Sequence, residues 1–123
     1  MDKINLLVTL THEEDNPNNV TLAFTMARKA ALDGYKVELI LLSNAVALGK
    51  KGQAEKIDIG EPFEPVKDLL SSYLEAGGKL KVCKACMIHN GVKEEDLIEK
   101  AEIINADYVV EALMTCEKSF QLN

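Results

Sequence analysis

The sequence has 123 residues, enough for one domain that buries roughly two-thirds of its unfolded surface and folds without a disulfide or a metal. Its formal net charge of −6 argues against direct binding to nucleic acid or to an anionic membrane surface, because both depend on clustered Lys and Arg side chains. No apolar run reaches the roughly 18 to 20 residues of a membrane-spanning helix. The N-terminus does not resemble a secretory signal, and an odd number of cysteines does not suit a secreted disulfide framework. We therefore expect a single cytoplasmic domain over residues 1–123.

The first part of the chain predicts a βαβ unit. Residues 4–10 form an apolar run typical of a strand buried on both faces. Residues 20–33 repeat apolar side chains, many of them Ala, at spacings of three and four, which predicts a helix that Gly34 ends. Residues 37–42 predict a second buried strand, joined to the first by a right-handed crossover.

The rest of the chain predicts further alternation of helices and strands. The expected elements are a helical turn over 44–48, a helix over 66–76, a strand over 79–82, a loop over 83–91, a helix over 93–105, a strand at 108–110, a short helical segment over 111–115 and a terminal strand over 118–122. The pattern implies an α/β fold, a three-layer α/β/α sandwich with a mostly parallel sheet. Reactive groups in such sheets lie beyond the carboxyl ends of the strands.

The most informative chemistry is a pair of thiols, Cys83 and Cys86, placed just after a predicted strand. Lys84 and His89 lie close by in sequence, and a nearby cation lowers the pKa of a thiol. Because the thiolate is the reactive nucleophile, these four residues make a candidate catalytic site. Two cysteines at this spacing are common to redox, metal-binding and sulfur-transfer sites.

Several kinds of chemistry compete for the two thiols. A thioredoxin-like dithiol is disfavoured, because the pair follows at least two strands and all three prolines precede it. A zinc site would need Cys83, Cys86, His89 and Cys116, a set that lacks the second closely spaced ligand pair of zinc knuckles. Persulfide carriage needs one exposed, activated thiolate, and a second thiol nearby can resolve or protect it. The thiols also fit simple packing, since free cysteine is among the most often buried residue types.

A second candidate is His12, which follows the first predicted strand and precedes three acidic residues. It is placed to face the thiol loop across the sheet and to act as an acid or base, although a solvated loop histidine accounts for the same pattern. No motif calls for a cofactor, and we expect no metal.

Several features recur in a fixed order along nearly the whole chain. They are the first strand, the Ala-rich helix, the segment Asp33-Gly34-Tyr35-Lys36-Val37, the turn Asn44-Ala45-Val46-Ala47-Leu48, Val82-Cys83 followed by Gly91-Val92, and the terminal Lys118-Ser119-Phe120. In this order and spacing the sequence resembles the DsrE/DsrF-like family, which includes sulfur-relay subunits of bacterial tRNA thiolation and of dissimilatory sulfur oxidation. The resemblance implies a five-stranded parallel sheet and assembly into homo- or hetero-oligomers.

The resemblance also implies roles for the thiol loop. Cys83 stands at the position of the sulfur-accepting cysteine of the relay subunits. Cys86 has no counterpart in those subunits, and this sequence has His89-Asn90 where they tend to have Arg. We therefore expect a small sulfur-carrier or sulfurtransferase-like protein that accepts sulfane sulfur on Cys83. Cys86 would be a resolving or auxiliary thiol, while Lys84 and His89 would favour the thiolate. Expected partners are copies of the chain or related subunits, together with sulfur donor and acceptor proteins. The alternative is a non-catalytic oligomeric module whose thiols bind a metal, act in dithiol redox, or pack.

Overall fold

An all-parallel five-stranded sheet organises the chain, and the computed structural model describes every residue from Met1 to Asn123. The strands are β1 (Leu6–Leu10), β2 (Val37–Leu41), β3 (Lys79–Cys83), β4 (Ala101–Ile104) and β5 (Lys118–Leu122), in the spatial order β4-β3-β2-β1-β5. The helices are α1 (Pro17–Leu32), α2 (Val66–Glu75), α3 (Lys84–His89) and α4 (Ala106–Thr115), with short 3₁₀ helices η1 (Ser43–Gly49), η2 (Ala54–Lys56) and η3 (Glu94–Asp96). None of these helices is both long enough and apolar enough to cross a membrane.

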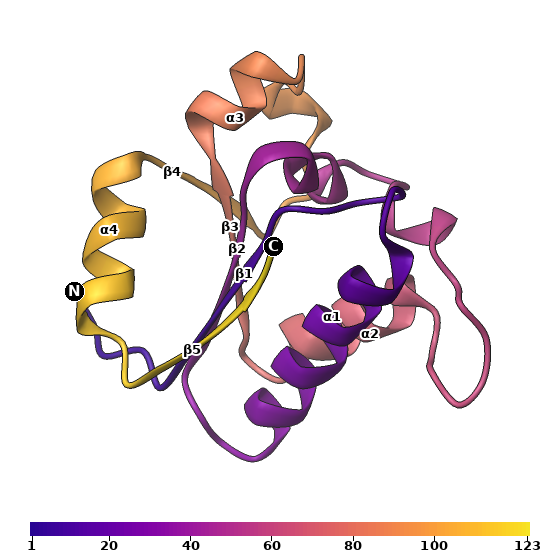
Figure 1. Cartoon of the computed structure of the whole chain (residues 1–123), viewed down its shortest axis with the longest axis horizontal. Helices are drawn as coiled ribbons and strands as arrows, with labels where there is room; N and C mark the ends of the chain where they lie inside the picture. Colours follow the sequence, from indigo (N-terminus) through magenta and orange to yellow (C-terminus); the bar gives the residue numbers. More distant parts are fainter.

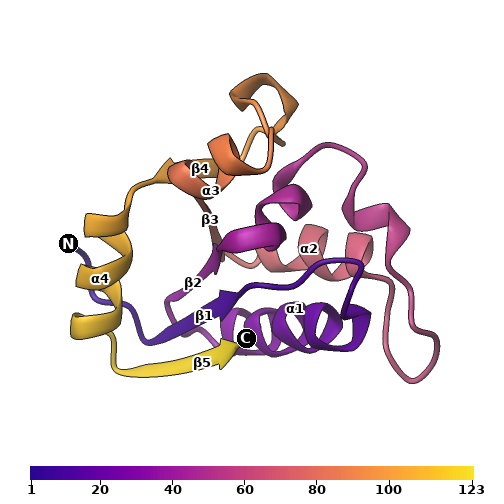
Figure 2. The ribbon, with the colours of Figure 1, turned by 45° about the horizontal axis from the view of Figure 1, so that its top comes forward.

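The predicted three-layer α/β/α sandwich is confirmed. Helices α1 and α2 cover one face of the sheet and α4 covers the other, while α3 lies beyond the carboxyl ends of the strands (Figure 1, Figure 2). The expected βαβ unit is present, with β1 and β2 paired in parallel from Leu6↔Val37 to Leu10↔Leu41. The terminal strand over 118–122 is confirmed as β5, which pairs with β1.

The main core fills the space between the sheet and the helices α1 and α2. Its largest fully buried side chains are Phe24, Tyr73, Leu10, Leu39, Leu41, Leu48, Leu69 and Leu80. Helix α1 begins three residues earlier than its apolar pattern, because Pro17 suits a first helical position and the Asn16 side chain accepts a hydrogen bond from Asn19 N at 3.1 Å. Small Ala side chains on its inner face let α1 pack closely on the sheet.

The second face of the sheet has a smaller core under α4, supplemented by polar contacts. Its buried residues are Ile4, Leu7, Ile40, Val109 and Ala112. Beside them, the Lys81 ammonium lies 2.6 Å from the Glu102 carboxylate and 5.2 Å from the centre of the Tyr108 ring. The Tyr108 hydroxyl donates to Glu38 at 2.6 Å. These contacts tie β2, β3 and β4 to α4, and they keep a lysine that is only 7% exposed paired with an acid.

The predicted helix over 93–105 is wrong. These residues form η3, a turn and the edge strand β4, which pairs with β3 from Leu80↔Ala101 to Cys83↔Ile104. The pairing gives hydrogen-bond partners to the outer edge of β3, a gain that local apolar spacing does not contain. The Asn105 side chain accepts from Tyr108 N at 3.0 Å, so it begins α4. The predicted strand at 108–110 therefore lies inside that helix, and the predicted loop over 83–91 contains the short helix α3.

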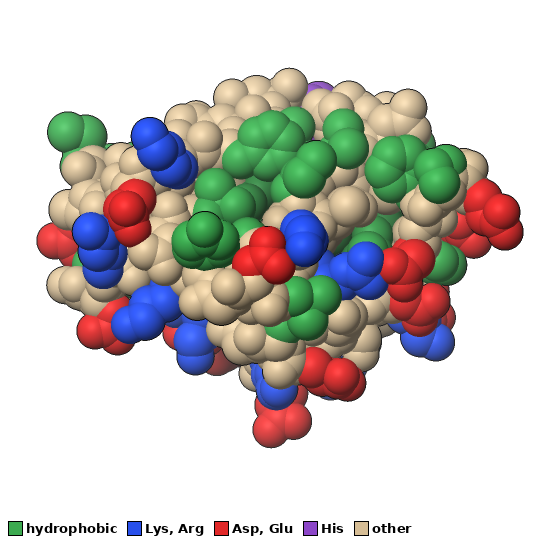
Figure 3. Space-filling view, turned by 90° about the horizontal axis from the view of Figure 1, so that it is seen from below, with side chains coloured by type: hydrophobic (Ala, Val, Ile, Leu, Met, Phe, Trp, Pro, Cys, Tyr) green, Lys and Arg blue, Asp and Glu red, His purple; other side chains and the backbone are tan.

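An apolar hollow lies beside the edge strand β5. Its apolar lining is Leu6, Met26, Ala30, Tyr35 and Phe120. Lys29 and Asp33 complete the lining and pair with each other at 3.0 Å. The space-filling view from below shows hydrophobic side chains gathered on this side of the molecule (Figure 3). The outer edge of β5 has no strand partner, so an apolar surface and an unpaired strand edge lie next to each other.

Removing Glu102 is expected to destabilise the protein more than removing the charge of Lys81. Glu102→Ala leaves a buried ammonium without its carboxylate, which should lower the free energy of unfolding by about 1–3 kcal/mol. Lys81→Met keeps most of the side-chain volume, and the half-exposed Glu102 remains solvated, so the loss should stay below about 1 kcal/mol. Urea unfolding of both variants tests this, with the exposed Glu99→Ala as the matched control. A Lys81→Met protein less stable than Glu102→Ala would contradict the prediction.

Candidate functional site

The two thiols meet where β3 passes into α3. Cys83 is the last residue of β3 and also the N-cap of α3, with extended backbone angles (φ −70°, ψ 120°). Cys86 is the third residue of the helix, so the first turn brings the two side chains to the same side. Both cysteines are free; Cys83 is buried and 7% exposed, whereas Cys86 is half-buried. The sequence-predicted pair thus lies together at the carboxyl edge of the sheet.

Hydrogen bonding and burial set the acidity of Cys86. Burial raises the pKa of the Cys86 thiol most, followed by its hydrogen bond to Cys83 and repulsion from a Cys83 thiolate. The main-chain N–H groups of Ser43 and of Cys86 itself act in the opposite direction. The Cys86 thiol is therefore harder to ionise than an ordinary cysteine, and the neighbouring Cys83 side chain contributes to this.

A strained turn after β2 forms the other wall of the site. Ser43 has a φ of +53° and is the one non-glycine residue with a positive φ. Its main-chain N–H acts on the Cys86 thiol. The Asn90 side-chain amide donates to Cys86 O at 2.8 Å and to Ser43 O at 3.4 Å, which links the end of α3 to this turn. The site is thus built from two neighbouring strand ends and both ends of α3.

Ser43, and a role for Asn90 at the thiols, are not among the predictions made from the sequence. Both carry a signal that can be found in retrospect. Ser43 directly follows a buried apolar strand whose end lies beside that of β3 in the sheet order, and Asn90 lies four residues after Cys86. Polar residues at the carboxyl ends of adjacent parallel strands are the expected neighbours of such a site.

Lys84 and His89 lie on the exposed face of α3. Neither side chain makes an ion pair with a carboxylate or a hydrogen bond with a thiol, so any effect on the thiols acts through solvent. Their role in favouring the thiolate remains a prediction. The exposed face of α3 carries two basic side chains and Ile88, which is 72% exposed, and no acid.

The zinc set considered from the sequence does not form. Cys116 ends α4 and precedes β5, so it lies at the amino edge of the parallel sheet, opposite Cys83 and Cys86. No group of three or more His, Cys, Asp or Glu side chains is arranged to hold a metal ion. The thiol pair has no further ligand within the chain with which to make a closed zinc site.

His12 contacts Asp15 in its own loop and the main chain of Asn123, and it is not brought to the thiols. Its Nδ1 lies 2.8 Å from the Asp15 carboxylate, and that hydrogen bond raises the pKa of the imidazole. Strand β2 lies between the strand that precedes His12 and the strand that carries Cys83. The neighbouring carboxylates of Glu13 and Glu14 both accept from the buried Gln53 amide, at 2.8 and 3.1 Å. These contacts fix the β1–α1 loop against the segment before η2.

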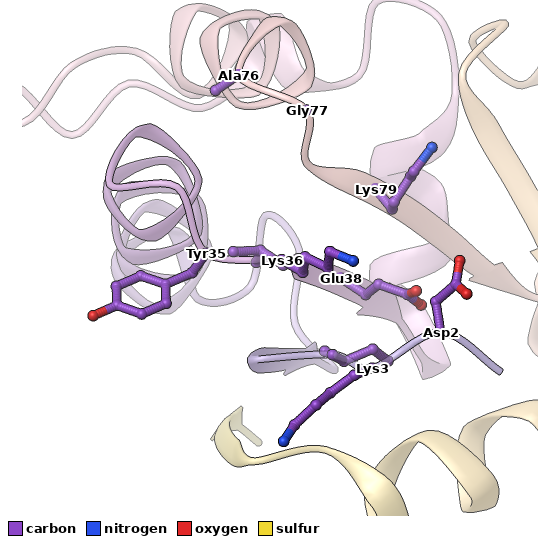
Figure 4. Close-up of a pocket in the computed structure, with 10 residues that line it drawn as sticks. Asp2, Lys3, Tyr35, Lys36, Glu38, Ala76, Gly77 and Lys79 are labelled. Atoms are coloured by element: carbon purple, nitrogen blue, oxygen red, sulfur yellow. The ribbon is translucent and has the colours of Figure 1, made fainter.

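A pocket of about 350 Å³ lies at the amino edge of the sheet, far from the thiols (Figure 4). Its charged lining residues are Asp2, Lys3, Lys36, Glu38 and Lys79. Two of these residues, Asp2 and Glu38, are acids, and Glu38 already accepts from Tyr108. Mixed charges and an engaged carboxylate give this pocket no single ligand chemistry, so the thiol pair is the candidate site.

Comparisons with known proteins agree with the fold. The model of a family described as the DsrE/DsrF-like family matches residues 5–122. The uncharacterized protein MJ0989 of Methanocaldococcus jannaschii is 39% identical over 83 residues, which cover 66% of this chain and 67% of that protein. The uncharacterized protein MK0008 of Methanopyrus kandleri is 33% identical over 81 residues, covering 66% and 63%. The chain therefore aligns with only about two-thirds of the length of these curated relatives.

Solved structures extend the likeness to the whole chain. The YchN protein of E. coli has a TM-score of 0.70 at 22% identity, covering 99% of this chain and 100% of that one. The protein of unknown function BT1422 from Bacteroides thetaiotaomicron has a TM-score of 0.69 at 18% identity, covering 98% and 95%. At such identities the likeness shows a shared fold.

The pKa of Cys86 should fall when Cys83 is replaced by serine. The substitution removes the repulsion of a Cys83 thiolate and leaves a hydroxyl that donates to the Cys86 sulfur. We expect the midpoint of the pH dependence of Cys86 alkylation to move to lower pH in Cys83→Ser. Peptide mass spectrometry after timed iodoacetamide labelling measures it, with Cys116→Ser as the control. An unchanged midpoint would show that the two thiols do not interact, and a higher midpoint would contradict the direction of the effect.

Proposed function

Because this chain belongs to the DsrE/DsrF-like family, we propose that it is a sulfur carrier that accepts sulfane sulfur as a persulfide on Cys83. The observation that carries the proposal is the placement of two free thiols on the first turn of α3, at the carboxyl edge of the parallel sheet. Parallel α/β sheets bind ligands and place reactive groups at this edge.

The proposed reaction is a thiol exchange. The Cys83 thiolate attacks the outer sulfur of a donor persulfide, the donor S–S bond breaks, and the donor leaves as a thiolate. The sulfur atom stays on Cys83 as a persulfide. The Cys86 thiol, which keeps its proton, donates a hydrogen bond to the charged Cys83 sulfur and so stabilises the attacking form.

The exposed basic face of α3 supports an anionic donor. Lys84 and His89 give this face a positive charge when the histidine is protonated, whereas the whole chain carries a net charge of −6. A persulfide group ionises readily, so a local positive field favours its approach to the thiols. In this proposal the two side chains steer the donor and do not touch the reacting sulfur atoms.

A second function, a non-catalytic binding module, is favoured by one observation. Cys83 is only 7% exposed and belongs to the main apolar core, as expected for a cysteine that merely packs. In that case the thiol would react only after unfolding. Sulfur uptake by the folded protein therefore separates the two functions.

The proposed carrier works in the cytoplasm, where thiols remain reduced, and exchanges sulfur with donor and acceptor proteins. It assembles with copies of itself through the apolar hollow beside β5. The unpaired strand edge continues the apolar surface, and Lys29 and Asp33 carry opposite charges on the same surface. In a twofold contact each of these charges would face the other on the second copy.

Intact-protein mass after brief exposure to a small persulfide donor tests the carrier function. Wild type, Cys86→Ser and Cys116→Ser should each gain the mass of one sulfur atom, and Cys83→Ser should gain none. Cys116→Ser is the matched control, because this thiol lies at the opposite edge of the sheet. Absence of sulfur uptake in every form would favour the packing module, and uptake lost only in Cys86→Ser would assign the acceptor to Cys86.

Met26→Glu should weaken self-association by placing a charge in the hollow. Light scattering coupled to size exclusion should show wild type larger than a monomer and Met26→Glu shifted towards the monomer. Met114→Glu is the control, since Met114 is an equally apolar side chain that is 79% exposed on α4 and outside the hollow. A monomeric wild type, or equal dissociation by both substitutions, would remove this surface from the proposal.

A further inference from the structure

We propose that Cys86 discharges the Cys83 persulfide within the chain, releasing hydrogen sulfide and leaving a Cys83–Cys86 disulfide. This inference rests on the proposed function, because the persulfide must first form on Cys83. It adds a second activity to sulfur carriage: the protein would reduce sulfane sulfur to sulfide whenever no acceptor takes the sulfur.

The geometry places the second nucleophile next to the atom it must attack. Cys83 is the N-cap and Cys86 the third residue of α3, so the first turn of the helix brings the two thiols to the same side. Side chains three residues apart on a helix lie about 5–6 Å apart at Cβ, against roughly 3.5–4.5 Å in a disulfide. A small movement at the start of the six-residue helix α3 therefore suffices, and strand β3 can stay in place.

The Cys83 sulfur is held at the end of β3, beside the first turn of α3 where Cys86 lies. An added sulfur atom extends beyond Cys83 Sγ. Attack on Sγ yields a disulfide, whereas attack on the outer atom would only move the persulfide from one cysteine to the other. The placement of Cys86 three residues after the helix N-cap favours the first route, in which the Cys83 sulfur is the electrophile.

The step is balanced without an external oxidant. The Cys86 thiol loses its proton, and its sulfur bonds to Cys83 Sγ. The S–S bond of the persulfide breaks, and the outer sulfur leaves as hydrosulfide, which takes up the proton as hydrogen sulfide. The sulfane sulfur is reduced to sulfide while the two cysteine thiols are oxidised together to a disulfide. An external thiol, either a cytosolic thiol or added dithiothreitol, then reduces the disulfide and restores the carrier.

The same surroundings set how fast discharge occurs. Burial and the neighbouring Cys83 raise the pKa of Cys86, so only a small fraction of its thiol is ionised near neutral pH. Apart from Cys83, the groups acting on Cys86 are the main-chain N–H groups of Ser43 and of Cys86, and no charged side chain from another element joins them. Discharge should therefore be slow at neutral pH, leaving time for an acceptor, and should accelerate as the pH rises.

The test loads the full chain with a small persulfide donor, removes the excess donor, and follows both released sulfide and intact mass. Wild type should release one sulfide per loaded persulfide and finish as a disulfide that dithiothreitol reverses. Cys86→Ser should keep its persulfide and release sulfide at least about tenfold more slowly. Cys86→Ala serves as a second variant, with its urea unfolding compared with wild type, and Cys116→Ser should behave as wild type.

The outcomes separate this inference from the proposed function. A wild-type persulfide as long-lived as that of Cys86→Ser and Cys86→Ala overturns the inference and leaves the carrier intact. A persulfide that moves to Cys86 without sulfide release also overturns it. Failure of wild type and both Cys86 variants to take up sulfur overturns the carrier function, and the discharge step falls with it. Faster sulfide release at higher pH in wild type alone supports the step.

Discussion

Parallel pairing between β2 and β3 is the constraint on which the site depends. The register that sets Leu41 opposite Val82 makes the two strands end together, so the Ser43 turn lies beside the start of α3. If these strands were antiparallel, the turn and the thiols would lie at opposite edges of the sheet. The N–H of Ser43 acts on Cys86 because of this pairing, whereas Cys83 and Cys86 are brought together within the β3–α3 junction itself.

The two faces of the sheet contribute to this arrangement in different ways. The face under α1 and α2 is almost wholly apolar and includes Cys83 in its core, which fixes the end of β3 by packing. The face under α4 combines a small apolar cluster with the Lys81–Glu102 pair, which holds β3 to the edge strand β4. Strand β3 is thus held from both sides, and the reactive residues sit at a rigid strand end with a short helix beyond it.

Much of the fold follows from local sequence patterns, and the failures have one physical origin. The βαβ unit, α2 and β5 have apolar spacings that agree with the tertiary structure. In residues 93–105 the spacing suggests a helix, but Leu97 packs in the main core while Ile104 contacts the cluster under α4. In the sequence these two residues look like part of one apolar helix face, although they pack in different cores. The strand forms instead of the helix because it pairs with the outer edge of β3.

The candidate site was predictable in its thiols but not in its surroundings. Cys83 and Cys86 are recognisable from their spacing after a strand, whereas the contribution of Ser43 depends on a backbone angle and on a neighbour about forty positions away. Lys84 and His89 are close to the thiols in sequence, yet helical geometry turns them to the outer face of α3. Proximity along the chain is therefore a poor guide to which groups touch a thiol at the start of a helix.

The positive φ of Ser43 has a consequence for which residues position 43 can accept. Its hydroxyl makes no hydrogen bond, so the contribution of this residue is a conformation that aims a main-chain N–H. Glycine or asparagine adopts that conformation readily, so either preserves the turn without any hydroxyl. A β-branched residue such as threonine is close to serine in size, but it strongly disfavours a positive φ. The main-chain N–H would then no longer be directed at the Cys86 sulfur. Substitution tolerance at this position is thus set by steric freedom of the backbone rather than by side-chain chemistry.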